Sequence, residues 1–125
     1  MFAAHRQLDN LIVTVDWNGQ QIDGATKDVM NLGDLVAKFK AFDWDVLQVN
    51  GNDMYAIVDM LYQAKDRSGK GKPVAILMKT DMGYGVDFMQ GTHKWHGKAP
   101  NAEQTEIALA QLEETLGDYP YPYEG

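Results

Sequence analysis

Two stretches of the sequence carry side chains that could bind a metal ion or a phosphate group. The first is 16–24, Asp-Trp-Asn-Gly-Gln-Gln-Ile-Asp-Gly, in which Asn18 offers an amide oxygen and Gly19 frees the backbone. Oxygen ligands suit a hard cation such as Mg²⁺, which keeps phosphate groups in its shell. A calcium EF-hand does not fit, because Gln21 would stand at its glycine position and Lys27 at its glutamate position. A plain Asn-Gly turn after a strand explains the same residues, so both interpretations stay open.

The second stretch, 91–100, combines two His, two Lys and a Trp with glycines. Imidazole and ammonium groups donate hydrogen bonds to phosphate oxygens, and glycine lets the backbone approach a ligand. His93 and His96 are three residues apart, but no Cys and no third neighbouring His completes a zinc site. The upstream Gly-Tyr-Gly at 83–85 lacks the third glycine of a dinucleotide-binding motif. A solvated loop that Trp95 anchors to the domain explains the composition equally well.

The elements that must position these stretches form an alternating pattern. Apolar, β-branched runs predict strands at 11–16, 45–50 and 73–80, with helical patterns between them. Strand, helix, strand, helix, strand is typical of right-handed crossovers, so we expect an α/β fold whose parallel sheet has helices on both faces. The long connections 17–30 and 81–100 then leave the carboxyl ends of strands, where open α/β sheets bind ligands.

Three helices are expected. Asn52 or Asp53 is a suitable N-cap for the second, and Asn101 with Gln104 predicts a capping box for the third. The third helix is expected to run to about residue 116, where Gly117 ends it, and the tail at 118–123 is expected to be extended. The apolar residues at helical spacing are Leu32, Leu35, Val36 and Phe39 in the first helix and Met54, Ile57, Val58 and Leu61 in the second.

Composition narrows the class of protein. With 125 residues, 45% of them hydrophobic and 23% charged, residues 1–125 suit a single globular domain. A net charge of −7 disfavours binding to nucleic acid and to anionic membranes, and no apolar run is long enough to cross a bilayer. The absence of Cys excludes disulfides and thiolate sites and fits a cytoplasmic protein. Because the net charge is negative, any phosphate must be held locally, by a metal, backbone N–H groups or a few Lys and His.

Taken together, the segments resemble transketolase, in the N-terminal section or subunit that binds thiamine diphosphate. The family has Asp-x-Asn-Gly closing in Ile-Asp-Gly, found here at 16–24, and Lys-Thr-x-x-Gly-x-Gly, found at 79–85. It also has Trp-His-Gly-Lys-x-Pro or a close variant, found here at 95–100. The resemblance covers nearly the whole chain, in order and spacing, and is closest to the split or short N-terminal subunits of prokaryotes.

The resemblance implies a partial thiamine-diphosphate-binding fold, with 1–125 as the incomplete, C-terminal part of that domain. The complete enzyme would move a two-carbon ketol unit between sugar phosphates. The family's Gly-Asp-Gly, with another metal ligand, lies upstream of this sequence. The cofactor-activating Glu lies in a pyrimidine-binding domain or C-terminal subunit. We therefore expect a homo- or hetero-oligomeric enzyme, and no turnover by these residues alone.

The resemblance also assigns roles to individual residues. Asn18 would be the side-chain ligand of Mg²⁺, or of Ca²⁺ in its place, and Gln20 would supply a backbone carbonyl to the same ion. Ile22 would be an apolar contact near the thiamine ring. His96 would be catalytic, reaching the cofactor diphosphate and the reacting end of the substrate, and Lys98 would assist with substrate phosphate or hydroxyls.

Two further residues depart from the common pattern. His93, a second candidate substrate contact, is present only in some variants of the family, and Met82 replaces a basic residue that often contacts the diphosphate. Two alternatives stay open. The chain could be a truncated, non-catalytic α/β module. It could instead belong to another thiamine-diphosphate enzyme, such as a deoxyxylulose-phosphate synthase or one chain of a dehydrogenase, although the Ile-Asp-Gly and Trp-His-Gly segments favour transketolase.

Overall fold

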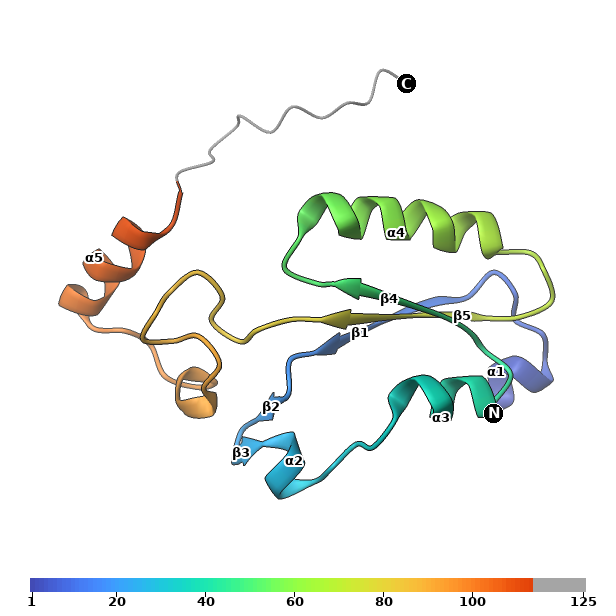
Figure 1. Ribbon diagram of the computed structural model, residues 1–125, viewed down its shortest axis with the longest axis horizontal. Coiled ribbons are helices and arrows are strands. Elements are labelled where there is room, and N and C mark those ends of the chain that lie inside the picture. Colours follow the sequence, from blue (N-terminus) through green and yellow to red (C-terminus); the bar gives the residue numbers. More distant parts are fainter. Residues whose placement is uncertain (114–125) are drawn as a thin grey trace, which may run out of the picture.

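The computed structural model describes residues 1–113, and its centre is a parallel sheet (Figure 1). The strands are β1 (Ile12–Trp17), β4 (Asp45–Asn50) and β5 (Val74–Lys79), in the spatial order β1-β5-β4. The central strand β5 is buried from Val74 to Leu77, because both of its edges are paired and both of its faces are covered. The three predicted strands are confirmed, each to within one residue of its expected bounds.

Helices cover the two faces of the sheet. The helix α4 (Met54–Arg67) packs on β4 and β5, whereas α3 (Leu35–Ala41) packs on β4 from the opposite face (Figure 1). Both begin at an Asp whose carboxylate accepts a backbone N–H three residues later, at 2.9 Å for Asp34 and 3.0 Å for Asp53. These caps satisfy N–H groups that the first helical turn leaves unpaired. The predicted parallel α/β architecture with helices on both faces is therefore confirmed.

The hydrophobic core lies between α4 and the sheet. Leu47, Val74 and Ile76 point to the same face and meet Ala64, which has no exposed surface at all. A small side chain at that point lets the helix approach the strands closely. The edge strand β1 is not covered by α4. Its side chains on the face that α4 covers in β4 and β5, such as Ile12, are therefore exposed.

The connection after β1 has more structure than a long loop. It contains the two-residue strands β2 (Gln20–Gln21) and β3 (Gly24–Ala25), which pair antiparallel, and the short helix α2 (Thr26–Val29). A further short helix, α1 (Phe2–His5), precedes β1.

The connection after β5 leads away from the sheet to a 3₁₀ turn, η1 (His93–Trp95), and to α5 (Ala102–Gln111) (Figure 1). The expected capping box is confirmed: Asn101 Oδ1 accepts the Gln104 N–H at 2.9 Å, and Gln104 Oε1 accepts the Asn101 N–H at 3.0 Å. The expected end near residue 116 is wrong, because the chain leaves helical geometry at Leu112. Leu112 instead packs against Gly85, where an added Cβ would lie 2.9 Å from its Cδ2.

The expected stop at Gly117 and the tail at 118–123 lie outside the described residues. Within residues 1–113, no helix is long and apolar enough to cross a membrane.

Candidate functional site

All three strands of the main sheet end at the same edge, because they run parallel. Trp17, Lys79 and Asn50 are aligned in register as the last residues of β1, β5 and β4. Both sequence stretches that were expected to bind ligands leave from this edge, one after β1 and one after β5. The edge therefore places the candidate side chains on one end of the molecule.

The first loop begins with a tight turn. Asn18 Oδ1 accepts the backbone N–H of Gln20 at 2.9 Å, and Gly19 has a φ of 71°, which favours glycine. The Gly19 carbonyl accepts from both the backbone N–H of Thr26, at 2.9 Å, and its hydroxyl, at 3.2 Å. The Asn-Gly turn is thus present. It does not exclude metal binding, because an amide oxygen has a second lone pair.

Beyond this turn, the β2–β3 hairpin presents its tip to solvent. Ile22 lies at the tip and is 64% exposed. Gly24, by contrast, is buried against Val29 with a φ of 150°. The loop therefore has a fixed base and an apolar tip.

The second loop folds back on itself before it reaches the histidines. The Gly91 N–H donates to the Met82 carbonyl at 2.8 Å, and Val86 forms a small buried centre at 5% exposure. Gly83 has a φ of 68° and lies so close to Met89 that an added Cβ would stand 2.6 Å from the Met89 carbonyl oxygen. Only glycine fits there. The chain thus re-emerges at residue 91 close to where it left the sheet.

Trp95 anchors the turn that carries the histidines. Its indole N–H donates to the Phe88 carbonyl at 2.9 Å, and the two rings meet edge-to-face at 5.2 Å. Lys98 Nζ lies 4.9 Å from the centre of the Trp95 ring, within the range of a cation–π interaction. The ammonium group is therefore held beside the turn but stays exposed.

The two histidines differ in their surroundings. His93 is half-buried in the 3₁₀ turn, whereas His96 is exposed directly after it, where its backbone N–H donates to the His93 carbonyl at 2.9 Å. Within residues 1–113 the His96 imidazole has no hydrogen-bond partner. It is therefore free to bind a ligand.

The two loops meet. The β3 strand of the first loop contacts the η1 turn of the second, although almost 70 residues separate them in sequence. The structure thereby brings the Asn18–Ile22 loop to the turn that holds His93 and His96, which sequence spacing alone could not show.

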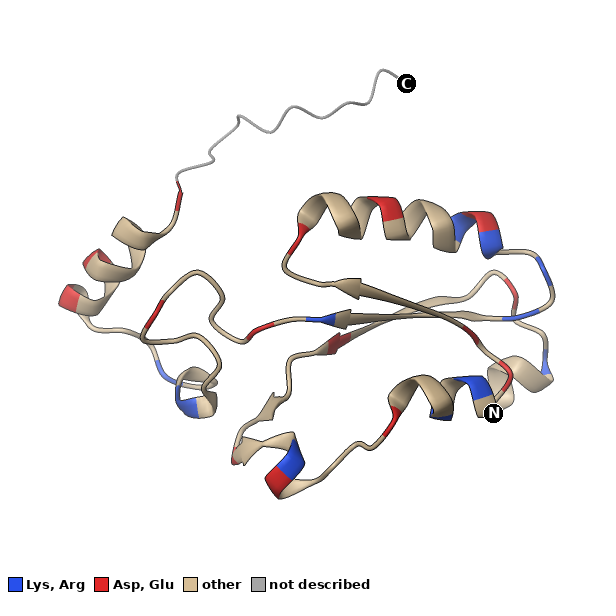
Figure 2. Ribbon diagram, viewed as in Figure 1, with Lys and Arg blue, Asp and Glu red and all other residues tan. Residues whose placement is uncertain are grey.

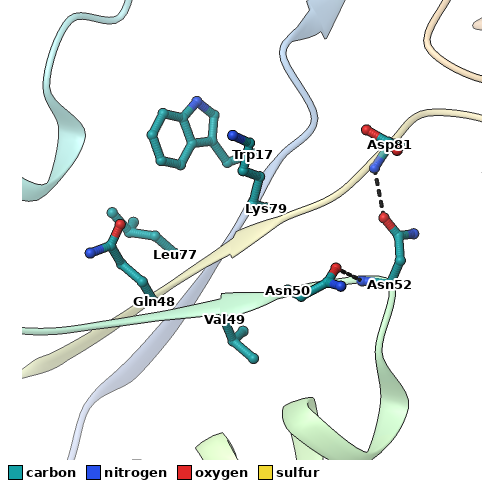
Figure 3. A pocket seen from close by; sticks show the side chains of 8 residues that line it. All are labelled: Trp17, Gln48, Val49, Asn50, Asn52, Leu77, Lys79 and Asp81. Atoms are coloured by element: carbon teal, nitrogen blue, oxygen red, sulfur yellow. Dashed lines mark hydrogen bonds between the residues drawn. The ribbon is translucent and has the colours of Figure 1, made fainter.

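A pocket of about 460 Å³ lies at the strand ends next to these loops (Figure 3). Its lining combines amide groups, one ammonium group and one carboxylate with apolar side chains. Sequence analysis named Asn52 only as a candidate N-cap and did not single out Gln48 or Asn50, although the Asn-Gly-Asn segment at 50–52 stands at a strand end just as the two loops do. The same rule about carboxyl ends would have found them. The pocket is lined by Trp17, Gln48, Val49, Asn50, Asn52, Leu77, Lys79 and Asp81.

The loops carry no broad basic field, so any anion bound there would be held by a few local groups. Figure 2 shows many of the Lys and Arg residues at the end of the sheet where the strands begin, opposite the loops. Within the described residues, no group of three or more His, Cys, Asp or Glu is arranged to hold a metal ion. The first loop offers amide and carbonyl oxygens, a ligand type that suits Mg²⁺ and Ca²⁺.

Sequence comparison finds the same family along almost the whole chain. A family model described as the thiamine diphosphate binding domain of transketolase matches residues 1–122. An apulose-4-phosphate transketolase subunit of Phocaeicola vulgatus is 39% identical over 110 residues, which are 88% of this chain and 38% of that protein. A 6-deoxy-6-sulfo-D-fructose transketolase subunit of a Clostridium species is 39% identical over 113 residues, covering 90% of this chain and 40% of that protein.

Solved structures agree. The transketolase of Campylobacter jejuni superposes with a TM-score of 0.78 at 33% identity, covering 88% of this chain and 17% of that one. A Pichia stipitis transketolase in complex with sedoheptulose 7-phosphate gives 0.75 at 33% identity, covering 86% and 16%. The chain thus spans about two fifths of the length of the subunits it matches and about one sixth of these structures.

Proposed function

This chain belongs to the transketolase family, in its thiamine-diphosphate-binding domain, and from that membership we propose that residues 1–125 form the C-terminal part of such a domain. In this proposal they supply one side of a thiamine diphosphate–Mg²⁺ site for ketol transfer between sugar phosphates. The observation that carries the proposal is the contact between β3 and η1. It joins an oxygen-bearing loop to a histidine-bearing turn at the carboxyl edge of a parallel sheet, where α/β proteins bind phosphorylated ligands.

The metal would be held by the first loop. Asn18 would offer its amide oxygen through the lone pair that Gln20 N–H does not use, and Gln20 would offer its backbone carbonyl. These are hard oxygen ligands of the kind that Mg²⁺ or Ca²⁺ prefers. The remaining ligands would come from the diphosphate and from another segment of the domain.

The cofactor and the substrate would lie against the two loops. The exposed Ile22 at the hairpin tip would contact the thiamine ring. When bound, thiamine diphosphate supplies the carbanion stabilisation that ketol transfer requires, and the protein contributes binding and orientation.

His96 would act as a hydrogen-bond donor, either to a diphosphate oxygen or to the substrate oxygen on which charge develops. Its exposed, unpartnered imidazole next to the anchored Trp95 supports that role. Lys98, held near the Trp95 ring, would meet the phosphate or hydroxyls of the sugar. His93 would be a weaker contact, because it is partly buried within its own turn.

The relatives from Phocaeicola vulgatus and the Clostridium species are named as transketolase subunits. We therefore propose that this chain acts in a homo- or hetero-oligomer in which a pyrimidine-binding domain or C-terminal subunit completes the cofactor site. The sugar phosphates would bind only in that assembly. The alternative of a non-catalytic α/β module makes the opposite prediction, namely no cofactor binding in any assembly.

The test is a calorimetric titration of thiamine diphosphate with Mg²⁺ into the complete transketolase assembly that contains this chain. Asn18→Leu removes the oxygen donor, and we expect cofactor affinity to fall at least about tenfold, a typical loss for a disrupted metal site. Asn31→Leu is the matched control, because Asn31 Oδ1 also accepts a backbone N–H two residues later, from Gly33 at 2.8 Å, in an exposed loop. Equal affinities in the two variants, with normal circular dichroism, would contradict the metal assignment.

A further inference from the structure

The chain leaves β5 under restraint from both neighbouring strands. On the β1 side, Thr80 Oγ1 donates to the Asp16 carboxylate, and the Thr80 N–H donates to the Trp17 carbonyl at 3.4 Å. On the β4 side, the Gly51 N–H donates to the Lys79 carbonyl at 2.7 Å. The first residues after the strand are therefore placed by the whole sheet edge rather than by β5 alone.

Asn52 extends this restraint by one residue. Its Oδ1 accepts the backbone N–H of Asp81 at 2.8 Å, while its own backbone N–H donates to Asn50 Oδ1 at 3.1 Å (Figure 3). The turn between β4 and α4 thus holds the start of the histidine-bearing loop across 29 positions of sequence. The restraint on the loop after β5 therefore comes from outside that loop, from the turn between β4 and α4.

Asp81 is also bound from the far end of the loop. Gln90 Nε2 donates to Asp81 Oδ2 at 3.0 Å, and one residue later the Gly91 N–H donates to the Met82 carbonyl at 2.8 Å. These two bonds close the base of the loop. His93 and His96 follow within a few residues, so the position of Asp81 decides where the histidine turn begins.

We propose that Asn52 and Gln90 are positioning residues for His96, acting through Asp81. Asn52 holds the backbone of Asp81 and Gln90 holds its carboxylate, and together they set the histidine turn against the β2–β3 hairpin. This inference rests on the proposed function for its catalytic consequence, whereas its structural half can be measured without cofactor. Neither residue needs to touch the substrate.

Bonds of this kind are modest in water, because Asp81 is exposed and solvent competes for each partner. Their effect is on geometry. Loss of one bond would not unfold the sheet, whose core lies on α4, but it would let the loop sample other positions. Misplacement of a catalytic group by about 1 Å can cost up to a hundredfold in rate.

The structural arm measures backbone hydrogen exchange in the 125-residue chain. Asn52→Ala and Gln90→Glu should each speed exchange in 82–96 about fivefold, the effect of losing one ordinary hydrogen bond, and leave Val74–Leu77 unchanged as an internal check on folding. Asn52→Asp keeps an oxygen in place for the Asp81 N–H and should restore slow exchange. The matched controls Asn31→Ala and Gln63→Glu change the same chemistry at exposed positions elsewhere and should have no effect.

Gln90→Glu also distinguishes a role of the Asp81 carboxylate from a general packing defect. It places a second carboxylate against Asp81, so the two groups repel when both are ionised. Salt screens repulsion between exposed carboxylates, so the excess exchange over the parent chain should shrink as ionic strength rises. An excess that is constant with ionic strength would overturn the role of the Asp81 carboxylate.

The functional arm uses the complete transketolase assembly. Asn52→Ala and Gln90→Glu should lower kcat about tenfold with little change in KM for the ketose donor, and His96→Ala in the same assay sets the scale. We call the hydrogen bonds from Asn52 and Gln90 to Asp81 the clamp on Asp81. Unchanged hydrogen exchange in the variants would overturn this clamp, whatever kcat is measured. Faster exchange with normal kcat, while His96→Ala is impaired, would overturn positioning and leave the proposed function standing. A fully active His96→Ala variant would overturn the role of His96 and with it the positioning inference, whereas the Asn18→Leu titration would still decide the proposed cofactor site.

Discussion

Replacing Gly51 by Ala tests the close approach that joins β4 to β5 at the functional edge. A Cβ built at Gly51 would overlap Thr80 Cγ2 and lie 2.9 Å from Met78 Cβ and 3.3 Å from the Met78 carbonyl carbon. Thr80 cannot turn away freely, because its hydroxyl donates to Asp16. Since the Gly51 φ is not in the left-handed region, the cost of Gly51→Ala is one of space rather than of backbone conformation.

The expected loss in free energy of unfolding is the sum of two costs and one smaller gain. Overpacking against a fixed backbone costs about 1–3 kcal/mol, and the shift needed to relieve it also weakens the Gly51–Lys79 hydrogen bond, worth about 1 kcal/mol. Alanine regains about 0.4–1 kcal/mol by restricting the unfolded chain. The net loss in free energy of unfolding should be about 2 kcal/mol, which lowers Tm by roughly 6–10 °C in a domain of this size.

The assay is urea unfolding of the 125-residue chain, followed by far-UV circular dichroism. Gly97→Ala is the matched control, because an added Cβ there meets nothing within 4 Å and its φ is not left-handed. It should be neutral or stabilise by up to about 1 kcal/mol. If Gly51→Ala were as stable as Gly97→Ala, the β4–α4 turn would not approach Thr80 and Met78 as closely as described, and the basis of the clamp on Asp81 would fail.

Three further predictions address the core and the site. Ile76→Ala, at a position 1% exposed, should cost about 2–5 kcal/mol in urea unfolding, and a loss below about 1 kcal/mol would contradict the assignment of the core. In the complete assembly, His96→Ala should lose at least about tenfold in kcat/KM and His93→Ala much less; the reverse order would show that the roles in the turn are misassigned. The 125 residues alone should show no ketol transfer above a protein-free control, because the family's cofactor-activating Glu is expected in a pyrimidine-binding domain or C-terminal subunit, and measurable turnover would refute this.

Much of the fold follows from local pattern. The apolar runs that became β1, β4 and β5 are interpretable as strands without any tertiary contact. Of the three, only β5 is buried on both faces, which requires apolar residues at successive positions, whereas β1 and β4 are partly exposed. The caps at Asp53 and Asn101 are equally local, since each side chain bonds a backbone N–H three residues away. Alternation of these elements implied a parallel sheet, and the sheet implied that both loops leave from one edge.

The end of α5 could not be predicted from the local sequence pattern. Helical spacing and Gly117 favoured a longer helix, but Leu112 turns out of the helix to pack against Gly85, and Gln111 exchanges hydrogen bonds with Asp87 at 2.8 and 2.9 Å. These contacts join residues more than 20 positions apart. Their gain outweighs the small intrinsic preference of a few more residues for the helix.

The sequence by itself indicated which residue types could bind a diphosphate and a metal, and that they would follow the carboxyl ends of strands, because residue type and the succession of strands and helices along the chain are local properties. Only the tertiary structure decided that the β2–β3 hairpin touches the His93–Trp95 turn, that a pocket lies beside Lys79, and that Asn52 holds Asp81. The reason is that a hydrogen bond or a packing contact depends on distance in space. The sequence around Asn52 and Asp81 does not show that these two residues become hydrogen-bond partners in the folded chain.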